Sequence, residues 1–218
     1  TSIHKLSEKE YDPSIYKNTR IFHTTGIMLA LGENTRKTTI DMMKKFKKAG
    51  ALVSFDVNFR GNLWSGPEAK KVIEEILPIV DIFFCSEDTA KLTFKKEGPV
   101  KDILHEFATD YDISIVVATQ RIVHSPKKHT FGSIIYDAKK KEYFSEEPYR
   151  DIEVVDRIGS GDAYISGVLY GLLNFNMDCQ KALEYGNATG AIKNTIPGDM
   201  PSSNKEEVDR IIYDHHHV

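Results

Sequence analysis

Short apolar segments alternate with amphipathic segments along most of the chain. The amphipathic segments repeat their apolar residues at helical spacing, whereas the apolar runs have the length of β-strands. Alternating strands and helices predict an α/β fold, with a doubly wound, mainly parallel sheet and helices on both faces. Residues 136–144 hold three consecutive lysines between two β-like stretches and predict an exposed hairpin. The strand-length runs fall at residues 21–22, 52–57, 82–85, 113–118 and 133–136.

Two of the predicted helices carry clear boundary signals. Residues 35–48 have apolar residues at helical spacing, and Gly50 follows as a stop. Residues 67–77 begin with Pro67 and end before Pro78, as a proline at each side of a helix favours. These signals support the division of the chain into strands and helices.

Composition narrows the class of protein. With 218 residues, 40% of them hydrophobic, the chain can bury one large core, and we expect a single domain over residues 1–218. Its 29 basic and 32 acidic residues are scattered, which argues against a nucleic acid partner. Cys85 and Cys179 are the only cysteines, and the chain opens without a signal-peptide pattern, so we expect a reduced, cytoplasmic protein. The apolar runs are too short to span a membrane.

A glycine-containing turn precedes one strongly patterned helix. From Asp162 onward, apolar residues recur at helical spacing, which places Gly159-Ser160-Gly161 at the helix N-terminus. Small residues there let several backbone N–H groups converge, and the helix start favours negative charge, so phosphate is the expected guest. The Asp162 carboxylate could accept a proton from an attacking hydroxyl. The alternative, a tight turn with Asp162 as a helix cap, is left open by the spacing alone.

The segment Asp-Arg-Ile-Gly-Ser-Gly-Asp at residues 156–162 resembles the signature of the PfkB/ribokinase family of carbohydrate kinases. Family members have a glycine-alanine-glycine-aspartate turn, and Ser160 stands in place of the alanine here. The resemblance implies a ribokinase-like fold, with ATP and Mg²⁺ as cofactors. It also implies that Asp162 is the catalytic base, and that the amides of Gly159, Ser160 and Gly161 stabilise charge on the γ-phosphoryl group. A Walker A lysine motif and a G-x-G-x-x-G opening are both missing, which disfavours P-loop ATPases and dehydrogenases.

Polar residues that directly follow the predicted strands are the next candidates, because ligands gather at the carboxyl ends of parallel strands. Residues 55–60, together with Leu63 and Trp64, resemble the corresponding stretch of 2-keto-3-deoxygluconate kinases. The resemblance implies that Asn58 and Arg60 face ATP phosphate, and that Arg60 also binds the acid sugar. A planar fork of donors suits Arg60 to either role. The alternative is a solvated arginine in a loop.

The stretch Ser86-Glu87-Asp88-Thr89 follows the third apolar run, where the family commonly has an asparagine and a glutamate near Mg²⁺ and phosphate. Ser86 and Thr89 occupy those two positions. Glu87 or Asp88 could instead hold the metal through water, or could simply begin the next helix as favourable N-terminal acids. The helix-start interpretation is favoured.

Four more residues are candidates by resemblance. Thr119 and Arg121 follow the fourth apolar run, where many members have a glycine-bearing turn near the nucleotide, so we expect nucleotide contacts although the glycine is missing. Asn187 lies in a stretch similar to the family's small-residue helix beside the adenine, and the resemblance implies that Asn187 contacts the nucleotide. Asp199 lies in a late loop that approaches the sugar in 2-keto-3-deoxygluconate kinases. The alternative is that residues 197–198 form a plain turn and that Asp199 is exposed without a role in binding.

The resemblance extends from near Thr1 to at least Val208, but it begins well inside the family pattern. Roughly the N-terminal third of a typical member, with its early strands and β-sheet lid, is therefore expected to be absent, and a homo-oligomer would lack the usual lid-mediated contact. The resemblance favours an ATP-dependent kinase acting on a primary hydroxyl of 2-keto-3-deoxygluconate. The alternatives are a ribokinase- or fructokinase-like kinase, and a non-catalytic nucleotide-binding remnant.

Overall fold

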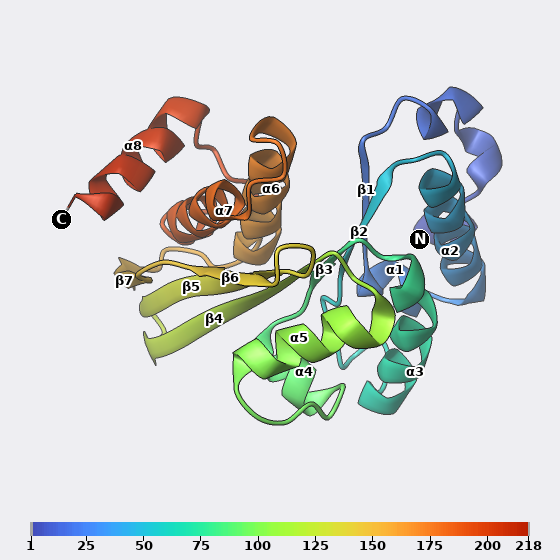
Figure 1. Ribbon diagram of the computed structural model, residues 1–218, viewed down its shortest axis with the longest axis horizontal. Helices are drawn as coiled ribbons and strands as arrows, with labels where there is room; N and C mark the ends of the chain where they lie inside the picture. The colour runs from blue at the N-terminus through green and yellow to red at the C-terminus, as the bar shows by residue number, and fades with distance from the viewer. Residues whose placement is uncertain (1, 218) are drawn as a thin grey trace. The chain divides into compact units, whose positions relative to one another are not determined.

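The computed structural model describes residues 2–217 and contains two compact units (Figure 1). The first unit comprises residues 2–117 and 136–141, and the second comprises residues 118–135 and 142–217. The boundary between them falls inside two strands rather than in a linker. The expectation of a single domain over residues 1–218 stays a prediction.

The first unit is built on parallel strands. These are β1 (Ile21–Thr25), β2 (Leu52–Asp56), β3 (Ile82–Phe84) and the beginning of β4 (Ile115–Ser125), in the order β1-β2-β3-β4. Each neighbouring pair runs parallel. The side chains of β2 and β3 are largely buried, as expected of strands covered on both faces. The prediction of a mainly parallel α/β sheet is confirmed.

Helices follow these strands as the alternating pattern predicts. Ser65 caps α3 by accepting a hydrogen bond from the Glu68 amide at 3.3 Å, and Pro67 occupies the first turn. The α-helices are α1 (Gly26–Ala30), α2 (Glu33–Lys48), α3 (Gly66–Ile76), α4 (Glu87–Leu92) and α5 (Val100–Tyr111). The short 3₁₀ helices are η1 (Ser2–Lys5), η2 (Glu8–Glu10), η3 (Pro13–Tyr16) and η4 (Leu77–Ile79). The helices predicted at residues 35–48 and 67–77 are confirmed as α2 and α3.

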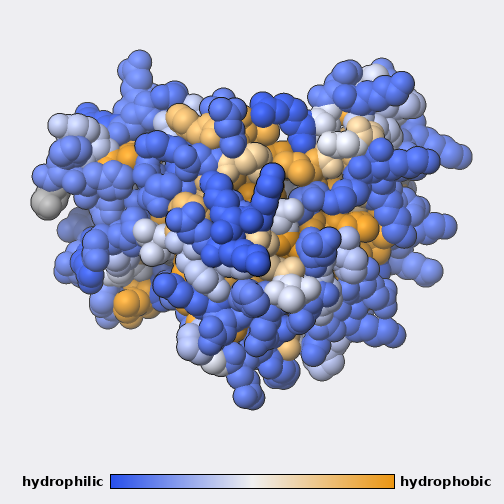
Figure 2. All heavy atoms as spheres, in the orientation of Figure 1, coloured by the Kyte–Doolittle hydropathy of each residue, from blue (hydrophilic) through white to orange (hydrophobic). Residues whose placement is uncertain are grey.

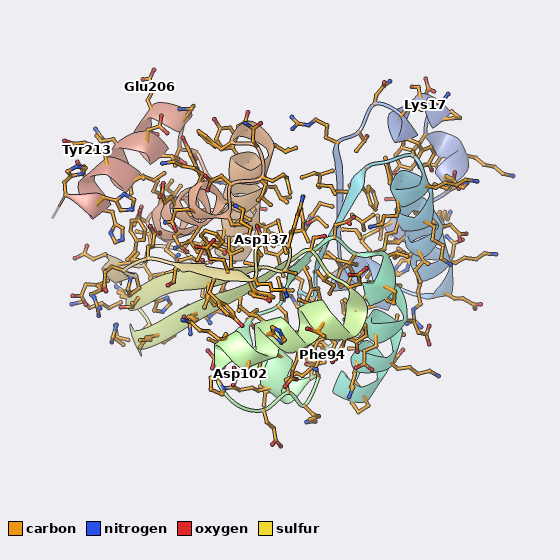
Figure 3. The ribbon with its side chains drawn as sticks, in the orientation of Figure 1. Lys17, Phe94, Asp102, Asp137, Glu206 and Tyr213 are labelled. Atoms are coloured by element: carbon orange, nitrogen blue, oxygen red, sulfur yellow. The ribbon has the colours of Figure 1, made fainter. Side chains whose placement is uncertain are left out.

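Three phenylalanines form a buried aromatic cluster in this unit. One of them, Phe94, is labelled in Figure 3. The ring of Phe107, on α5, lies 5.0 Å from that of Phe83, on β3, and 5.3 Å from that of Phe94, which follows α4. The rings meet edge to face, the arrangement that aromatic quadrupoles favour. The cluster therefore joins helix and strand through directional contacts as well as burial.

The second unit combines antiparallel strands with three helices. Strand β5 (Lys128–Asp137) pairs antiparallel with β7 (Tyr149–Glu153), and β6 (Glu142–Ser145) lies next to β5 in the strand order. The helices are α6 (Ser160–Asn174), α7 (Cys179–Asn194) and α8 (Lys205–His216).

The hairpin predicted at residues 136–144 is confirmed as the turn between β5 and β6. Its tip is stabilised by Asp137, whose carboxylate accepts hydrogen bonds from the amides of Lys139 and Lys140, each at 3.0 Å. An aspartate that binds the backbone two and three residues ahead is typical of tight turns.

One predicted strand boundary is wrong. The apolar run at residues 113–118 suggested a strand end at Ala118, but β4 continues through Thr119 and Arg121 to Ser125. From Gln120 onward the side chains of β4 are exposed on both faces. Because burial no longer dictates the residue types there, the apolar signal stops before the strand does.

Helices α6 and α7 pack at backbone distance. A Cβ atom on Gly171 of α6 would lie 2.5 Å from the Ala182 Cα of α7, and one on Gly167 would lie 2.4 Å from the Tyr185 carbonyl oxygen. Val168 and Leu172, on the predicted apolar face of α6, have no exposed surface. Glycine at two positions one turn apart therefore sets the distance between the two helices.

Hydrophilic residues cover most of the face drawn in Figure 2, with smaller apolar areas between them. Large apolar side chains are exposed at Leu92, Ile158 and Met200. Within residues 2–217, no helix combines the length and the hydrophobicity that crossing a bilayer requires.

The close packing of α6 on α7 generates a stability prediction. Gly171→Ala should lower the free energy of unfolding by about 1–3 kcal/mol, because the new methyl group overlaps backbone atoms that cannot swing aside. Gly66→Ala at the start of α3 is the matched control, since nothing lies within 4 Å of its Cβ position, and it should be neutral or stabilising by up to about 1 kcal/mol. Urea denaturation measures both values, and equal effects would contradict the packing argument.

Candidate active site

The glycine turn lies at the N-terminus of α6, as the sequence pattern predicts. Gly159 is the N-cap residue and adopts the left-handed conformation, with φ of 77° and ψ of 0°. No side chain caps this helix end. The Ser160 amide donates to the Arg157 carbonyl at 3.2 Å, whereas the amides of Gly161 and Asp162 have no partner among the described residues. An uncapped helix start with free N–H groups is a ready anion site.

The Asp162 side chain stands in the first turn of α6 and is exposed. Within residues 2–217, its carboxylate has no hydrogen bond or ion pair. A cap would bind a neighbouring amide, so the simple helix-cap interpretation of Asp162 finds no support. The carboxylate is instead available to accept a proton from a bound hydroxyl.

The late loop packs directly against this turn. A Cβ atom on Gly159 would lie 2.1 Å from the carbonyl oxygen of Asp199, so glycine is required there both by contact and by its φ. The Asp199 side chain itself is exposed. The structure thus brings the predicted substrate residue Asp199 next to the predicted anion turn, through its backbone.

Asp156 ties the same two segments together. One carboxylate oxygen accepts from the Ile158 amide at 2.9 Å, and the other accepts from the Gly198 amide at 3.1 Å. The Ile158 hydrogen bond lowers the pKa of Asp156, and the Gly198 amide and the nearby Lys193 charge act in the same direction. The sequence shows Asp156 inside the family segment, but nothing in the sequence indicates its bond to Gly198.

The strand-end residues of the first unit lie where the pattern places them, directly after β2. Asn58 is left-handed, with φ of 38°, and its amide donates to the Asp56 carboxylate at 3.1 Å. Arg60 is exposed, and its guanidinium donates to the Phe59 carbonyl at 3.0 Å. Trp64, part of the same resemblance, is buried. The binding roles of Asn58 and Arg60 stay predictions.

The Ser86 to Thr89 stretch begins α4. The Ser86 hydroxyl accepts from the Thr89 amide at 3.2 Å, which makes it the N-cap. Glu87 binds Lys91 at 2.7 Å, one turn along the helix, and Asp88 is exposed. This geometry agrees with the helix-start interpretation of both acids.

Within residues 2–217, no three histidine, cysteine, aspartate or glutamate side chains lie close enough together to hold a metal ion by themselves. Mg²⁺ is usually held by one or two carboxylates together with substrate phosphates and water. Asp88 fits such a partial role better than Glu87, because Glu87 already pairs with Lys91. The metal role of these two residues stays a prediction.

The remaining candidates lie in the second unit. Thr119 is half-buried and Arg121 is exposed, both within β4 rather than in the expected turn. Asn187 is completely buried on α7, where its side chain accepts from the Ser133 hydroxyl at 2.7 Å and donates to Glu146 at 2.7 Å. Both ends of the amide are therefore used within the fold, and the nucleotide contact of Asn187 stays a prediction. The sequence alone could not show these partners, which lie more than 40 residues away.

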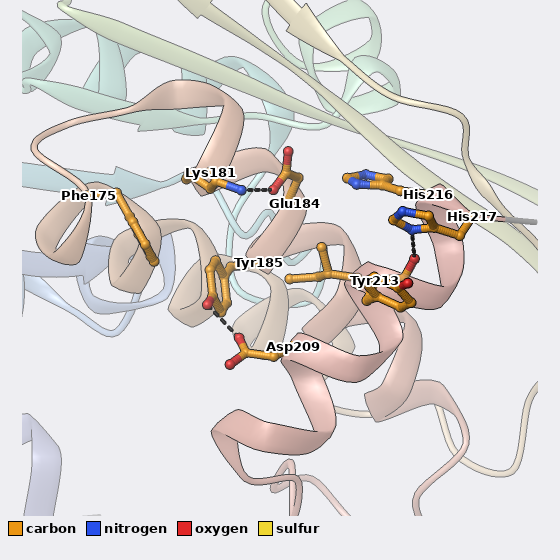
Figure 4. A pocket seen from close by; sticks show the side chains of 9 residues that line it. Phe175, Lys181, Glu184, Tyr185, Asp209, Tyr213, His216 and His217 are labelled. Carbon is orange, nitrogen blue, oxygen red and sulfur yellow. Dashed lines mark hydrogen bonds and ion pairs between the residues drawn. The ribbon is translucent and has the colours of Figure 1, made fainter.

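A separate cavity of about 300 Å³ lies between α7 and α8 (Figure 4). Two pairs of polar side chains in its lining bind each other: Lys181 binds Glu184 at 2.9 Å, and the Tyr185 hydroxyl donates to Asp209 at 2.6 Å. Burial and the bond to Asp209 raise the pKa of Tyr185 to about 12. No residue predicted to act in the site lines this cavity.

Among the described residues, the N-terminus of α6 combines an uncapped glycine turn with an unpaired carboxylate, and a free helix start of this kind is a typical anion site. Residues 2–206 match the family profile described as pfkB family carbohydrate kinase. The chain belongs to this family. The family resemblance of residues 156–162 is thereby confirmed.

Two curated relatives illustrate the similarity. The chain is 31% identical over 198 residues to 2-dehydro-3-deoxygalactonokinase of Haloferax volcanii, covering 91% of this chain and 58% of the relative. It is 30% identical over 206 residues to probable fructokinase-6 of Arabidopsis thaliana, covering 90% of this chain and 50% of the relative. The chain thus spans only a little over half the length of the curated relatives it matches.

Solved structures share the fold. The 2-dehydro-3-deoxygluconokinase of Thermotoga maritima is similar with a TM-score of 0.90 at 26% identity, covering 98% of this chain and 66% of that one. A putative ribokinase II from E. coli, in complex with ATP and Mg²⁺, is similar with a TM-score of 0.78 at 26% identity, covering 97% and 64%. The ribokinase-like fold prediction is confirmed.

The contact between Gly159 and Asp199 generates the second prediction. Gly159→Ala should lower the free energy of unfolding by at least about 2 kcal/mol, because the methyl group meets a backbone carbonyl and the left-handed φ becomes strained. Gly161→Ala, two residues away, has nothing within 4 Å of its Cβ and should be neutral or slightly stabilising. Urea titration of the two variants tests this difference, and equal stability would refute the tight packing of the late loop on the turn.

Proposed function

We propose that this chain carries the phosphoryl-transfer part of an ATP-dependent carbohydrate kinase. The observation that carries the proposal is the N-terminus of α6, where the amides of Gly161 and Asp162 and the adjoining Asp162 carboxylate have no partner within residues 2–217. Donors for a transferring phosphoryl group and an acceptor for a hydroxyl proton are the two parts that this chemistry needs.

In the proposed reaction, Asp162 accepts the proton of the sugar hydroxyl while the oxygen of that hydroxyl forms a bond to the γ-phosphorus of ATP. The bond between the γ-phosphorus and the bridging oxygen breaks, and ADP leaves with that oxygen. The amides of the glycine turn stabilise the charge on the γ-phosphoryl oxygens, with Gly161 and Asp162 contributing the free donors. Mg²⁺ bound with ATP would offset phosphate charge, and Asp88 and Glu87 are the residues proposed to hold it through water.

For the substrate we propose 2-keto-3-deoxygluconate, a sugar acid. The Haloferax relative and the Thermotoga structure are named for 2-dehydro-3-deoxy sugar acids, and Arg60 offers an exposed guanidinium suited to a carboxylate. Asp199 is proposed to approach the sugar from the late loop. Asn58, Thr119 and Arg121 are proposed nucleotide contacts.

A neutral sugar is the second candidate, because the Arabidopsis relative is named a probable fructokinase at nearly the same identity. A third outcome is nucleotide binding without turnover, since the chain spans only part of its relatives' length. The neutral-sugar alternative predicts turnover of fructose or ribose, and the binding alternative predicts no turnover of any sugar.

The proposed base generates the third prediction. Asp162→Asn should lower kcat by about 10²- to 10⁴-fold, because the amide cannot accept the hydroxyl proton. Its control is Asp102→Asn, which changes another exposed aspartate in the first turn of a helix (Figure 3) and should leave kcat unchanged. Sugar-dependent ADP formation, coupled to NADH oxidation, measures both. The assay uses this chain and a polypeptide that includes any residues encoded before Thr1, and an unchanged kcat for Asp162→Asn would exclude the mechanism.

The substrate proposal generates the fourth. The same assay with 2-keto-3-deoxygluconate, ribose and fructose should give the highest kcat/KM for the sugar acid. Arg60→Met should raise KM for the sugar acid much more than it changes KM for a neutral sugar, because only the acid offers a carboxylate to bind. Turnover of fructose or ribose without turnover of the acid would overturn the substrate assignment and leave the kinase mechanism standing. Nucleotide binding without any turnover would support a binding remnant.

A further inference from the structure

A buried lysine lies beside the glycine turn. Lys193, in the last turn of α7, has no exposed surface and is among the largest fully buried side chains. Its ammonium donates to the Asp156 carbonyl at 3.2 Å and to the Ile196 carbonyl at 2.9 Å. Within residues 2–217, no carboxylate forms an ion pair with it. The ammonium is therefore a buried charge whose hydrogen-bond partners are backbone carbonyls.

Such an arrangement is costly for stability alone. A buried charge loses its hydration, and hydrogen bonds to two backbone carbonyls offset only part of that cost. An apolar side chain in its place would avoid the cost of burying a charge but would leave both carbonyls without this donor. We therefore ask what the buried charge contributes besides stability, and its position beside the glycine turn indicates the answer.

The two carbonyls that Lys193 binds lie at the beginning of two segments. One segment contains the glycine turn, and the other packs against that turn. Asp156 opens the segment that leads to Gly159, and Ile196 opens the loop whose Asp199 carbonyl packs against Gly159. The last carbonyl of α7, on Asn194, also accepts the Asp156 amide at 3.2 Å. Lys193 and its neighbour therefore fix both the N–H and the C=O of Asp156.

The Asp156 carboxylate completes the arrangement, because it binds the amides of Ile158 and Gly198, one in each segment. The glycine turn and the late loop are thus held by a cation that binds carbonyls and by an anion that binds amides. The ammonium adds a fixed positive charge close to a helix N-terminus that already favours anions.

We propose that Lys193 is a positioning residue of the anion site: its buried ammonium orients the Gly159 to Asp162 turn and contributes positive potential to it. The inference rests on the proposed function, since that function gives the turn its phosphoryl group. Lys193 itself does not contact the reacting atoms. If the role of Lys193 is purely structural, its replacement should lower only the stability of the fold. If Lys193 positions the turn, its replacement should lower the affinity for anions in a protein that is still folded.

The test uses Lys193→Met, which keeps an unbranched apolar stem and removes the charge. Lys44→Met, on the exposed face of α2, is the charge-matched control. Calorimetry with ADP and with inorganic phosphate should show at least a tenfold loss of affinity for Lys193→Met and no change for Lys44→Met. Hydrogen exchange should become faster at residues 157–162 in Lys193→Met alone, and urea denaturation fixes conditions in which both variants are fully folded, so that loss of affinity is measured apart from any loss of stability.

Small cations provide a second measurement, because Lys193→Ala leaves a gap beside two carbonyls. Carbonyl oxygens are good ligands for a bare monovalent cation. Ammonium or potassium chloride should restore part of the exchange protection at residues 157–162, whereas tetramethylammonium chloride at the same ionic strength should not. If Lys193→Met does not fold, Lys193→Gln, which keeps a side-chain NH2 donor without the charge, replaces it in the calorimetry and exchange measurements, and Lys193→Ala remains the variant for the cation measurement.

The outcomes separate the two proposals. If Lys193→Met keeps wild-type affinity and wild-type exchange at residues 157–162, the positioning role is wrong. If the variant loses only stability, Lys193 is a structural residue and the inference falls. If the wild-type chain binds neither ADP nor phosphate, the proposed function fails for this chain, and the exchange and cation measurements still decide whether Lys193 orients the turn.

Discussion

The contact between α6 and α7, backbone against backbone, is the constraint on which the candidate site depends. Gly171 meets Ala182 with no room for a side chain between them, so the distance between the helices has little freedom. The N-terminus of α6 carries the glycine turn, and the C-terminus of α7 carries Lys193. A fixed distance between the helices therefore fixes the position of the cation relative to the anion site.

The two helix ends have complementary electrostatics. The start of α6 presents unpaired N–H groups and a partial positive charge, which suits an anionic ligand. The end of α7 presents carbonyls and a partial negative charge, which suits the ammonium of Lys193. A cation placed at the second end stabilises that end and also faces the segment that leads into the first. The Lys193 side chain thus places a positive charge at the C-terminus of α7 and binds the segment that leads into the N-terminus of α6.

The sequence predicts the elements well and their tertiary partners poorly. The parallel strands, α2, α3, α6 and the hairpin at residues 136–144 follow from periodicity and turn chemistry, which are local. The far half of β4 escapes prediction because its side chains are exposed and carry no burial signal. The partners of Asn187 and Lys193 could not be predicted for a different reason. A polar residue on a helix is expected to face solvent or a ligand, and only the folded chain shows the buried partners of these two side chains. The glycine turn is predictable because its geometry lies within a few consecutive residues.

The bonds that hold the turn also determine when it can form during folding. Lys193 and Gly198 reach Asp156 across 37 and 42 residues, so each contact closes a loop that contains α6 and α7. Contacts of such sequence separation carry a loop-closure cost and tend to form late. The anion site is therefore expected to be one of the last parts of the second unit to be completed. A ligand that needs this site would bind the finished fold and not its intermediates, so binding would draw the folding equilibrium toward the native state.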